Sequence, residues 1–290
     1  MSYVFHLSVI LGIYLALSYS LNLTMGFGGL LSFCHAAFYG TGAYGYALLL
    51  QTGASQAGAL AGAIGITTIL ALLIGVVSLR FRGDIFLFIT LGFQMIVSVV
   101  LYNWVELTNG PYGIASIPRP ELFGVTMRTP LQYAILTAAM LALLLPLLFR
   151  LYRSPFGLLL KALREDEVAA KSLGINAHAI FLQAFIIAAA IAAFPGALYA
   201  SYVTYIDPTS FTLKESIFLA AILLLGGAGN RKGPLVGAII MVLLPEALRF
   251  LGMPDAIAHN MREVIYGLML IFLMYFRPKG IAGEFRMTQR

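Results

Sequence analysis

The stretch RLYRSPFGLLLKALREDEVAAKSLG, residues 150–174, is a polar island in an otherwise apolar chain. It holds eight of the thirty charged residues, whereas no charged residue precedes Arg80. Apolar runs long enough to cross a bilayer lie on both sides of it. Each of these charges would cost roughly 2.5 to 3.5 kcal/mol inside hydrocarbon. The island is therefore predicted to be an ordered aqueous loop between two membrane spans, where a soluble partner could bind.

The composition places the chain in the membrane class. Of its 290 residues, 60% are hydrophobic and only 10% are charged, and the mean hydropathy is +0.91. Soluble domains usually carry about 25% charged residues. The chain is therefore predicted to be an all-α polytopic membrane protein. Its net charge of +6 does not indicate nucleic-acid binding, because the basic residues lie at the ends of apolar runs and form no stripes with interleaved aromatics.

The N-terminal stretch MSYVFHLSVILGIYLALSYSL is apolar but differs from a secretory signal. It has no basic n-region and no small-residue cleavage site. We therefore expect a retained first span, with the mature chain starting at or near Met1.

The apolar runs predict eight to nine membrane segments. A helix needs about 20 apolar residues to cross a hydrocarbon core of roughly 30 Å. By this measure the segments are 4–24, 30–51, 57–79, 84–104, 130–150, 179–203, 214–229, 233–251 and 262–276.

Two of these segments are predicted to be broken or re-entrant helices. Residues 26–45 are studded with glycines, and residues 214–229 are too short to cross a bilayer alone and end in a glycine cluster. Irregular backbone at membrane depth occurs where it is buried in protein or lines a cavity, and paired interrupted helices mark the pathway of many transporters. The alternative is that these glycines only permit close helix packing.

The distribution of lysine and arginine predicts the orientation. Cytoplasmic loops carry an excess of these residues. With the island on the cytoplasmic side, alternating spans place 13 of the 18 basic residues on that side, together with the C-terminal tail. The N-terminus then lies outside. The basic residues left on the outer side are Arg119, Arg128, Lys214, Arg249 and Arg262.

Three features are assigned to the outer side. The connection 105–129 is rich in proline and glycine, which favour turns over helix. It is either a solvated loop or a surface that receives a soluble binding protein. Asp207-Pro208 is expected to be a turn, and Glu246 with Arg249 is expected to form an ion pair.

Within the island, the sequence predicts two short helices. Ser154-Pro155 is a good helix start and Gly174 a good stop. If the chain bends near Arg164, the acids at 165–167 suit the positive end of a second helix, on which Ala169 and Ala170 present a small face for close approach. The alternative is an amphipathic helix that lies on lipid headgroups.

This island resembles the EAA loop through which permease subunits of ABC importers engage their ATPases. The resemblance rests on Glu167-Val-Ala169-Ala170 followed by Gly174, although the classical pattern has an acid where Val168 stands. The run FGLLLKALREDEVAAKSLGI, residues 156–175, is more narrowly similar to the branched-chain amino acid permease family of LivM type. Further stretches that resemble this family in order and spacing are 21–49, 82–124 and 196–245.

The resemblance implies an ABC importer permease fold, with residues 1–290 as a single transmembrane permease domain and residues 150–178 as its cytoplasmic ATPase-coupling loop. The coupling residues that it implies are Glu165, Asp166, Glu167, Ala169, Ala170 and Gly174.

The implied protein is a transport subunit and not an enzyme. The sequence independently lacks the G-x-x-x-x-G-K-[ST] loop of an ATP site, because GGAGNRKG at 226–233 has the wrong order. ATP and magnesium would be bound by two partner ATPases. The other implied partners are a homologous permease, expected to form a heterodimer, and an extracytoplasmic substrate-binding protein at the bacterial inner membrane.

The implied substrates are branched-chain and other hydrophobic amino acids, with urea, short amides or aromatic acids as alternatives. Polar side chains inside spans are candidates for the translocation path, because they are costly to expose to lipid. Hydrogen bonding between helices is the commoner reason for such residues. The candidates are Asn22, Ser32, His35, Thr90 and Gln94.

Two other classes compete with the importer. An ion-coupled secondary transporter needs ionisable groups buried mid-membrane, and His35 and Glu246 are the candidates expected at that depth. An intramembrane enzyme needs a metal pair or a nucleophile, and the spans offer no such constellation. The single cysteine, Cys34, excludes an internal disulfide and is expected to be a packing residue, and no metal-ligand set is expected.

Overall fold

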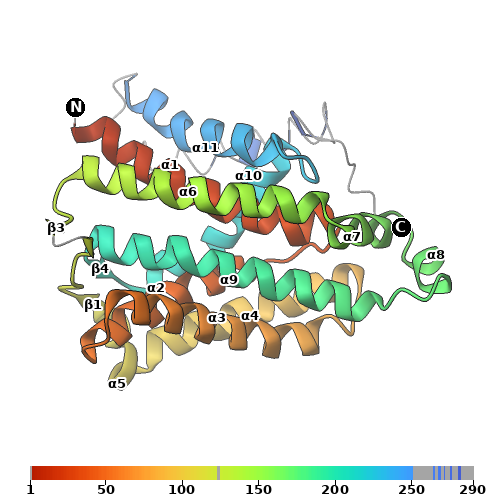
Figure 1. Cartoon of the computed structure of the whole chain (residues 1–290), viewed down its shortest axis with the longest axis horizontal. Helices are drawn as coiled ribbons and strands as arrows, with labels where there is room; N and C mark the ends of the chain where they lie inside the picture. The colour runs from red at the N-terminus through yellow and green to blue at the C-terminus, as the bar shows by residue number, and fades with distance from the viewer. Residues whose placement is uncertain are drawn as a thin grey trace.

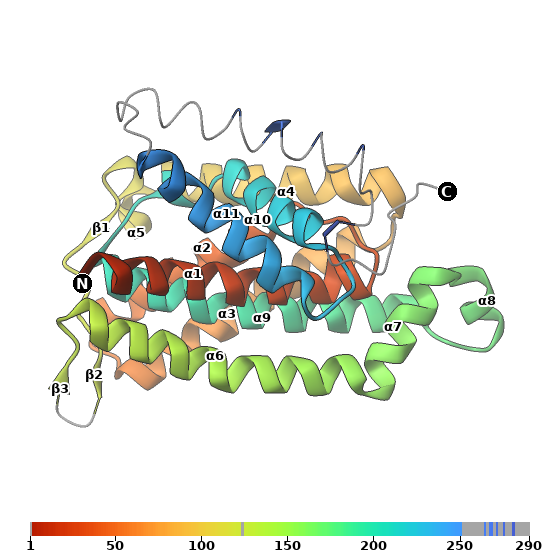
Figure 2. The same cartoon turned by 90° about the horizontal axis from the view of Figure 1, so that it is seen from above.

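The chain forms a bundle of long helices that run side by side in this computed structural model (Figures 1 and 2). The structure describes residues 2–122 and 125–250, together with positions 264, 267, 268, 271, 275, 280 and 281. The helices are α1 (Ser2–Leu21), α2 (His35–Gln51), α3 (Gln56–Ser78), α4 (Gly83–Asn103), α5 (Val105–Thr108), α6 (Pro130–Arg153), α7 (Pro155–Glu165), α8 (Glu167–Ser172), α9 (Ala177–Val203), α10 (Leu213–Gly226) and α11 (Gly233–Phe250).

Within the described residues, five helical stretches are long and apolar enough to cross a membrane. They are Ser2–Phe27, Gln56–Ser78, Gly83–Asn103, Pro130–Arg153 and Ala177–Val203. The first includes a π-helical turn, Asn22–Phe27, which continues α1. The prediction of an all-α membrane protein is confirmed. The predicted segment at 233–251 corresponds to α11, and the one at 262–276 lies outside the continuously described residues.

The two segments that were expected to be interrupted form the short helices α2 and α10. Non-helical chain at 28–34 precedes α2, and a short strand, β4 (Tyr205–Ile206), and a 3-10 turn, Pro208–Phe211, precede α10. The N-terminal ends of these two helices meet at Gln94, which lies at the middle of α4. Each short helix therefore begins about halfway along the bundle and runs toward one end, in opposite directions (Figure 2).

Glycines also permit close packing in this region, as the alternative interpretation held. A Cβ on Gly42 of α2 would lie 2.5 Å from the Cα of Ala193 on α9, so no larger residue fits without moving one helix. Small residues at such crossings let helix backbones approach closely. The predicted interruption and the alternative of close packing therefore both hold, because the helical break precedes α2 and its glycines pack against α9.

The island and the N-terminus lie at opposite ends of the bundle. Figures 1 and 2 show α7 and α8 at one end, and the start of α1 with α5 and the short strands at the other. The predicted topology requires this separation. The assignment of the α8 end to the cytoplasm stays a prediction based on the distribution of basic residues.

Small strands and turns close the end that carries the N-terminus. Strand β1 (Ile114–Ala115) pairs with β4, and β2 (Glu121–Leu122) pairs with β3 (Val125–Thr126). The connection 105–129 is thus largely non-helical, as predicted, apart from the single helical turn α5 and one 3-10 turn. Pairing of β1 with β4 ties this connection to the chain that leads into α10.

The other features assigned to this end are only partly as expected. Asp207 does initiate a turn, since its carboxylate accepts a hydrogen bond from the Ser210 amide and caps the 3-10 turn. Glu246 accepts a hydrogen bond from the Tyr3 hydroxyl. The side chain of Arg249, its expected ion-pair partner, lies outside the described part of the structure.

Candidate functional site

The island folds as two short helices with a sharp bend between them. The Ser154 side chain caps α7 and Pro155 occupies its first position, as predicted. Asp166 has an extended backbone that ends α7 and starts α8. After α8, Gly174 has a φ of +84°, a conformation that favours glycine. The backbone of the island therefore follows the helix–bend–helix pattern that the sequence predicts.

The three consecutive acids of the island make three different contacts. Glu165 is exposed and pairs with the neighbouring Arg164 at 2.6 Å. Asp166 accepts hydrogen bonds from the amides of Val168 and Ala169 at 3.0 and 2.9 Å, which caps α8. Glu167 alone of the three reaches another part of the bundle.

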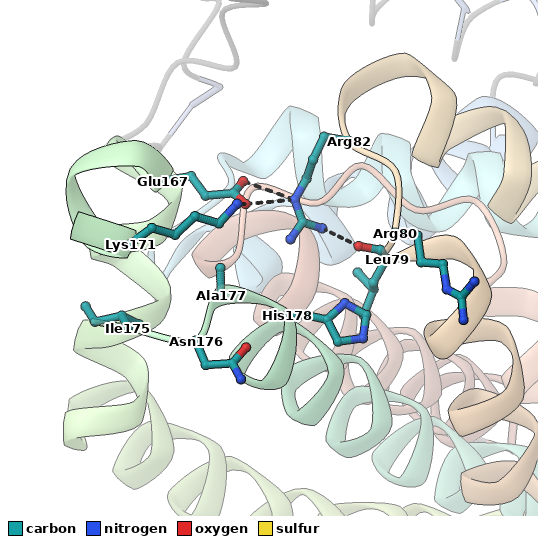
Figure 3. Close-up of a pocket in the computed structure, with 9 residues that line it drawn as sticks. All are labelled: Leu79, Arg80, Arg82, Glu167, Lys171, Ile175, Asn176, Ala177 and His178. Carbon is teal, nitrogen blue, oxygen red and sulfur yellow. Dashed lines mark hydrogen bonds and ion pairs between the residues drawn. The ribbon is translucent and has the colours of Figure 1, made fainter. Parts of the chain in front are cut away.

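Glu167 joins α8 to the connection between α3 and α4. Its carboxylate lies 3.0 Å from Arg82 Nε and 2.8 Å from Lys171 Nζ (Figure 3). Arg82 also donates to the Leu79 carbonyl and stacks over the Phe181 ring of α9 at 4.6 Å. Arg82 therefore holds α8 to two long helices at once. The sequence predicts that Arg82 lies on the island's side but does not indicate its partner, although no lysine or arginine before Arg80 could pair with the island's acids.

Burial and charge act in opposite directions on Glu167. Partial burial by itself would raise the pKa of this carboxyl, but the hydrogen bonds and positive charges of Lys171 and Arg82 outweigh it and lower the pKa below the usual value. Because the pKa is lowered in the folded state, the ion pairs stabilise α8 at neutral pH. That contribution is lost as the pH falls through the lowered pKa.

The outer face of α8 is small and apolar. Val168 and Leu173 are about four-fifths exposed, and Ala169 is exposed between them. Ala170 is buried, so only one of the two predicted alanines belongs to the free face. The exposed apolar residues protrude from a helix that is anchored on its other side by Glu167, which suits contact with another protein.

A second contact links the island to the segment that precedes α2. Arg164, at the end of α7, donates from Nη1 to the carbonyl oxygen of Gly26 at 2.8 Å. Its side chain is only 9% exposed and lies against Gly29. Movement of α7 would therefore act directly on the non-helical chain at 28–34, and through it on the start of α2.

Gln94 organises the polar junction where α2 and α10 begin. Its Oε1 accepts hydrogen bonds from the Ala37 amide at 2.7 Å and the Ser216 hydroxyl at 3.1 Å, and its Nε2 donates to the Phe211 carbonyl at 2.9 Å. Ser216 in turn accepts from the Ala36 amide at 2.9 Å. Backbone groups freed by the two helix breaks thus find partners inside the protein, as buried backbone must.

Three of the other predicted path residues lie around this junction. His35 Nε2 is 3.1 Å from the Ser20 hydroxyl, which donates to the Ala188 carbonyl. Thr90 accepts from the Phe33 amide at 3.3 Å. Ser32 lies 3.3 Å from the sulfur of Cys34, which is buried. Four of the five predicted residues are therefore brought together in the middle of the bundle.

Asn22 lies apart from this junction, near the island's end. It bonds to the Gly229 amide and the Asn230 carbonyl, both at 3.0 Å, and so fixes the glycine-rich connection between α10 and α11. All five predicted path residues are at most 3% exposed and hydrogen-bonded. In this conformation their contacts are those of helix packing, and a role along a path remains a prediction.

The expectation that His35 and Glu246 are the only ionisable groups near the middle of the bundle is wrong. Because α10 begins halfway along the bundle, its first turn carries Lys214 and Glu215 to the level of Ser216 and Gln94. Glu215 is partly buried and hydrogen-bonded by Tyr14 of α1. The sequence-based topology placed Lys214 on the outer side. A segment too short to cross the bilayer, however, already implied that its helix begins within the membrane.

The attachment of α8 can be tested by amide hydrogen exchange on the purified complex. In Glu167→Gln, we expect protection of the α8 amides to fall roughly 1.5- to 5-fold at neutral pH, the range of a partly exposed ion pair. The difference from the unmodified chain should close as the pH falls and Glu167 becomes protonated. Glu165→Gln is the matched control and should leave α8 unchanged. Equal protection in both variants would show that Glu167 does not hold α8.

Comparison with known proteins gives consistent matches over nearly the whole chain. The sequence model of a family described as "Branched-chain amino acid transport system / permease component" matches residues 3–274. The chain is 37% identical to the high-affinity branched-chain amino acid transport system permease protein LivM of Escherichia coli (strain K12), over 93% of this chain and 67% of that protein.

More distant matches come from a second type of permease and from an archaeon. The chain is 30% identical to the LivH permease protein of Escherichia coli (strain K12), over 65% of this chain and 61% of LivH. It is 26% identical to a probable LivM permease of Methanocaldococcus jannaschii, over 66% of this chain and 57% of that protein. No solved structure matches the chain.

Proposed function

Since the chain belongs to the branched-chain amino acid permease family of ABC transport systems, we propose that it is the permease subunit of an importer that carries branched-chain amino acids across the bacterial inner membrane. The observation that carries this proposal is the anchored helix α8, whose exposed apolar face lies at the end of the bundle away from the N-terminus. This face is where a partner ATPase would bind.

The proposed assembly has four kinds of component. Two cytoplasmic ATPases bind ATP and magnesium and contact residues 150–178 of this chain, which has no ATP site of its own. A homologous permease, as part of a heterodimer, completes the channel. An extracytoplasmic binding protein delivers the substrate. In this arrangement residues 1–290 form one permease domain with a cytoplasmic C-terminus.

The proposed mechanism transmits force along contacts that are present in the structure. Closure of the ATPases displaces α8, and Arg82 passes the displacement to α3, α4 and α9 through its contacts with Glu167 and Phe181. Arg164 passes it to the chain before α2 through the Gly26 carbonyl. Both routes end at the junction around Gln94, where two short helices can move relative to each other and open the path to one side at a time.

Reconstituted uptake tests this function. Proteoliposomes that contain the complete assembly should accumulate leucine, isoleucine and valine only when ATP is inside with the ATPases and the binding protein outside. Addition of ionophores should not reduce the rate of uptake. A panel of urea, short amides and aromatic acids tests the alternative substrates of the same importer class.

The opposite result would favour a secondary transporter. Glu215, His35 and Lys214 are ionisable groups at the level of the helix breaks, and such groups can couple transport to protons or sodium. Uptake that needs an ion gradient and proceeds without ATP would overturn the importer and assign the coupling to these residues.

A further inference from the structure

A basic pocket lies between α8, the start of α9 and the connection from α3 to α4 (Figure 3). Its volume is about 390 Å³. The polar side chains that line it are those of Arg80, Arg82, Glu167, Lys171, Asn176 and His178. Val168 and Leu173, the exposed apolar side chains of the island, do not line it.

The pocket has an excess of positive charge. Glu167 is its single acid and is already bound by Arg82 and Lys171. Arg80 and His178 are exposed, and neither has an ion-pair or hydrogen-bond partner within the described part of the chain. Figure 3 shows both on the side of the pocket away from Glu167. An anion placed there would meet Arg80, Arg82 and His178 without competing with Glu167.

The beginning of α9 adds to this positive potential. Asn176 caps this 27-residue helix by accepting a hydrogen bond from the Ala179 amide, and both Asn176 and Ala177 line the pocket. The N-terminal end of a long helix carries a partial positive charge that favours anions.

Exposed apolar side chains lie close in sequence to the pocket residues Leu79, Arg80 and Arg82. On the last turns of α3 and the first turn of α4, Val76, Val77 and Ile85 are 37%, 46% and 56% exposed, and Phe81 between them is 42% exposed. In a membrane protein such a surface contacts acyl chains. The pocket therefore lies where lipid-facing helix surface meets water, and a ligand in it can have a charged end among the basic groups and an apolar end along α3 and α4.

We propose that this pocket binds the phosphate group of an anionic phospholipid in the leaflet on the α8 side. Basic pockets at this depth attract anionic headgroups, and each basic side chain near the surface contributes. The phosphate lies beside Arg80, Arg82 and His178, and the acyl chains lie along Val77 and Ile85. This binding is independent of the substrate and of the transport direction.

Native mass spectrometry of the purified full-length complex measures the binding. Phosphatidylglycerol should be retained in preference to phosphatidylcholine. The double variant Arg80→Gln/His178→Gln should retain at least fivefold less phosphatidylglycerol. A fivefold change is roughly what the loss of one basic side chain near the membrane surface produces. The matched control Arg119→Gln/Arg128→Gln removes two arginines from the opposite end and should bind as the unmodified chain does.

A second measurement needs no variant. In nanodiscs, phosphatidylglycerol should increase hydrogen-exchange protection at residues 79–82 and 171–178 relative to phosphatidylcholine. Equal retention of both lipids, or equal binding by the two double variants, would overturn the proposal. Inorganic phosphate is the other source of the same group. If millimolar phosphate gives the same protection in phosphatidylcholine nanodiscs, the site binds free phosphate and the lipid assignment is wrong.

Discussion

Replacement of Ala169 by tryptophan is expected to abolish substrate uptake while the chain stays folded in the membrane. Ala169 is exposed on α8 between Val168 and Leu173, and its neighbour Ala170 faces inward. An indole at this position cannot fit where a methyl group lets a partner approach closely, and overpacking of a tight contact costs about 1 to 3 kcal/mol or more. Uptake by proteoliposomes should fall at least tenfold.

The same experiment separates loss of docking from loss of folding. Ala61→Trp is the matched control, because Ala61 is also exposed but lies on α3 near the opposite end of the bundle. The two variants should show equal thermal stability of the isolated chain, and only Ala169→Trp should lose the co-purifying ATPase. Normal uptake by Ala169→Trp would refute the assignment of α8 as the docking helix.

Replacement of Gln94 by leucine is expected to destabilise the protein more than any other single change considered. It removes three buried hydrogen bonds, those of Gln94 with the Ala37 amide, the Ser216 hydroxyl and the Phe211 carbonyl. A buried hydrogen bond contributes about 0.5 to 1.5 kcal/mol, so loss of the three bonds should reduce the free energy of unfolding by about 2 kcal/mol or more. Because Gln94 joins the starts of α2 and α10, uptake should also fall.

The matched control for this change is Gln51→Leu. Gln51 is exposed at the end of α2, and surface changes of this kind usually alter the free energy of unfolding by less than about 0.5 kcal/mol. Thermal unfolding of the two variants in the same detergent makes the comparison. Equal stability of the two would show that the hydrogen bonds of Gln94 do not hold the junction.

Much of the fold is predictable from the sequence because membrane spans leave a strong signal. The long apolar runs correspond to α1, α3, α4, α6 and α9. The island's two helices follow from local chemistry, since Ser154, Asp166 and Gly174 act through caps and backbone conformation that depend on near neighbours. These predictions needed no knowledge of distant contacts.

Contacts between distant segments were not predictable in the same way. The pairing of Glu167 with Arg82 joins residues 85 positions apart, and nothing in the local sequence specifies it. Gln94 was selected as a costly polar residue, but its partners Ala37 and Phe211 depend on where the two broken helices start. The depth of Glu215 was missed for the same reason, because the predicted span at 214–229 assumed that its first residues lie at the surface.

Site-directed cross-linking of α8 is the most direct test of the central claim, that a partner ATPase moves this membrane protein through its island. The single native cysteine, Cys34, is buried and will not interfere. In Ala169→Cys, a short thiol cross-linker applied to membranes should join this chain to the ATPase subunit, with a yield that changes between nucleotide-free and ATP-bound states, whereas Ala61→Cys should give no such product. Absence of an ATPase adduct at position 169, or labelling of this cysteine by an impermeant reagent from the outer side, would contradict the account.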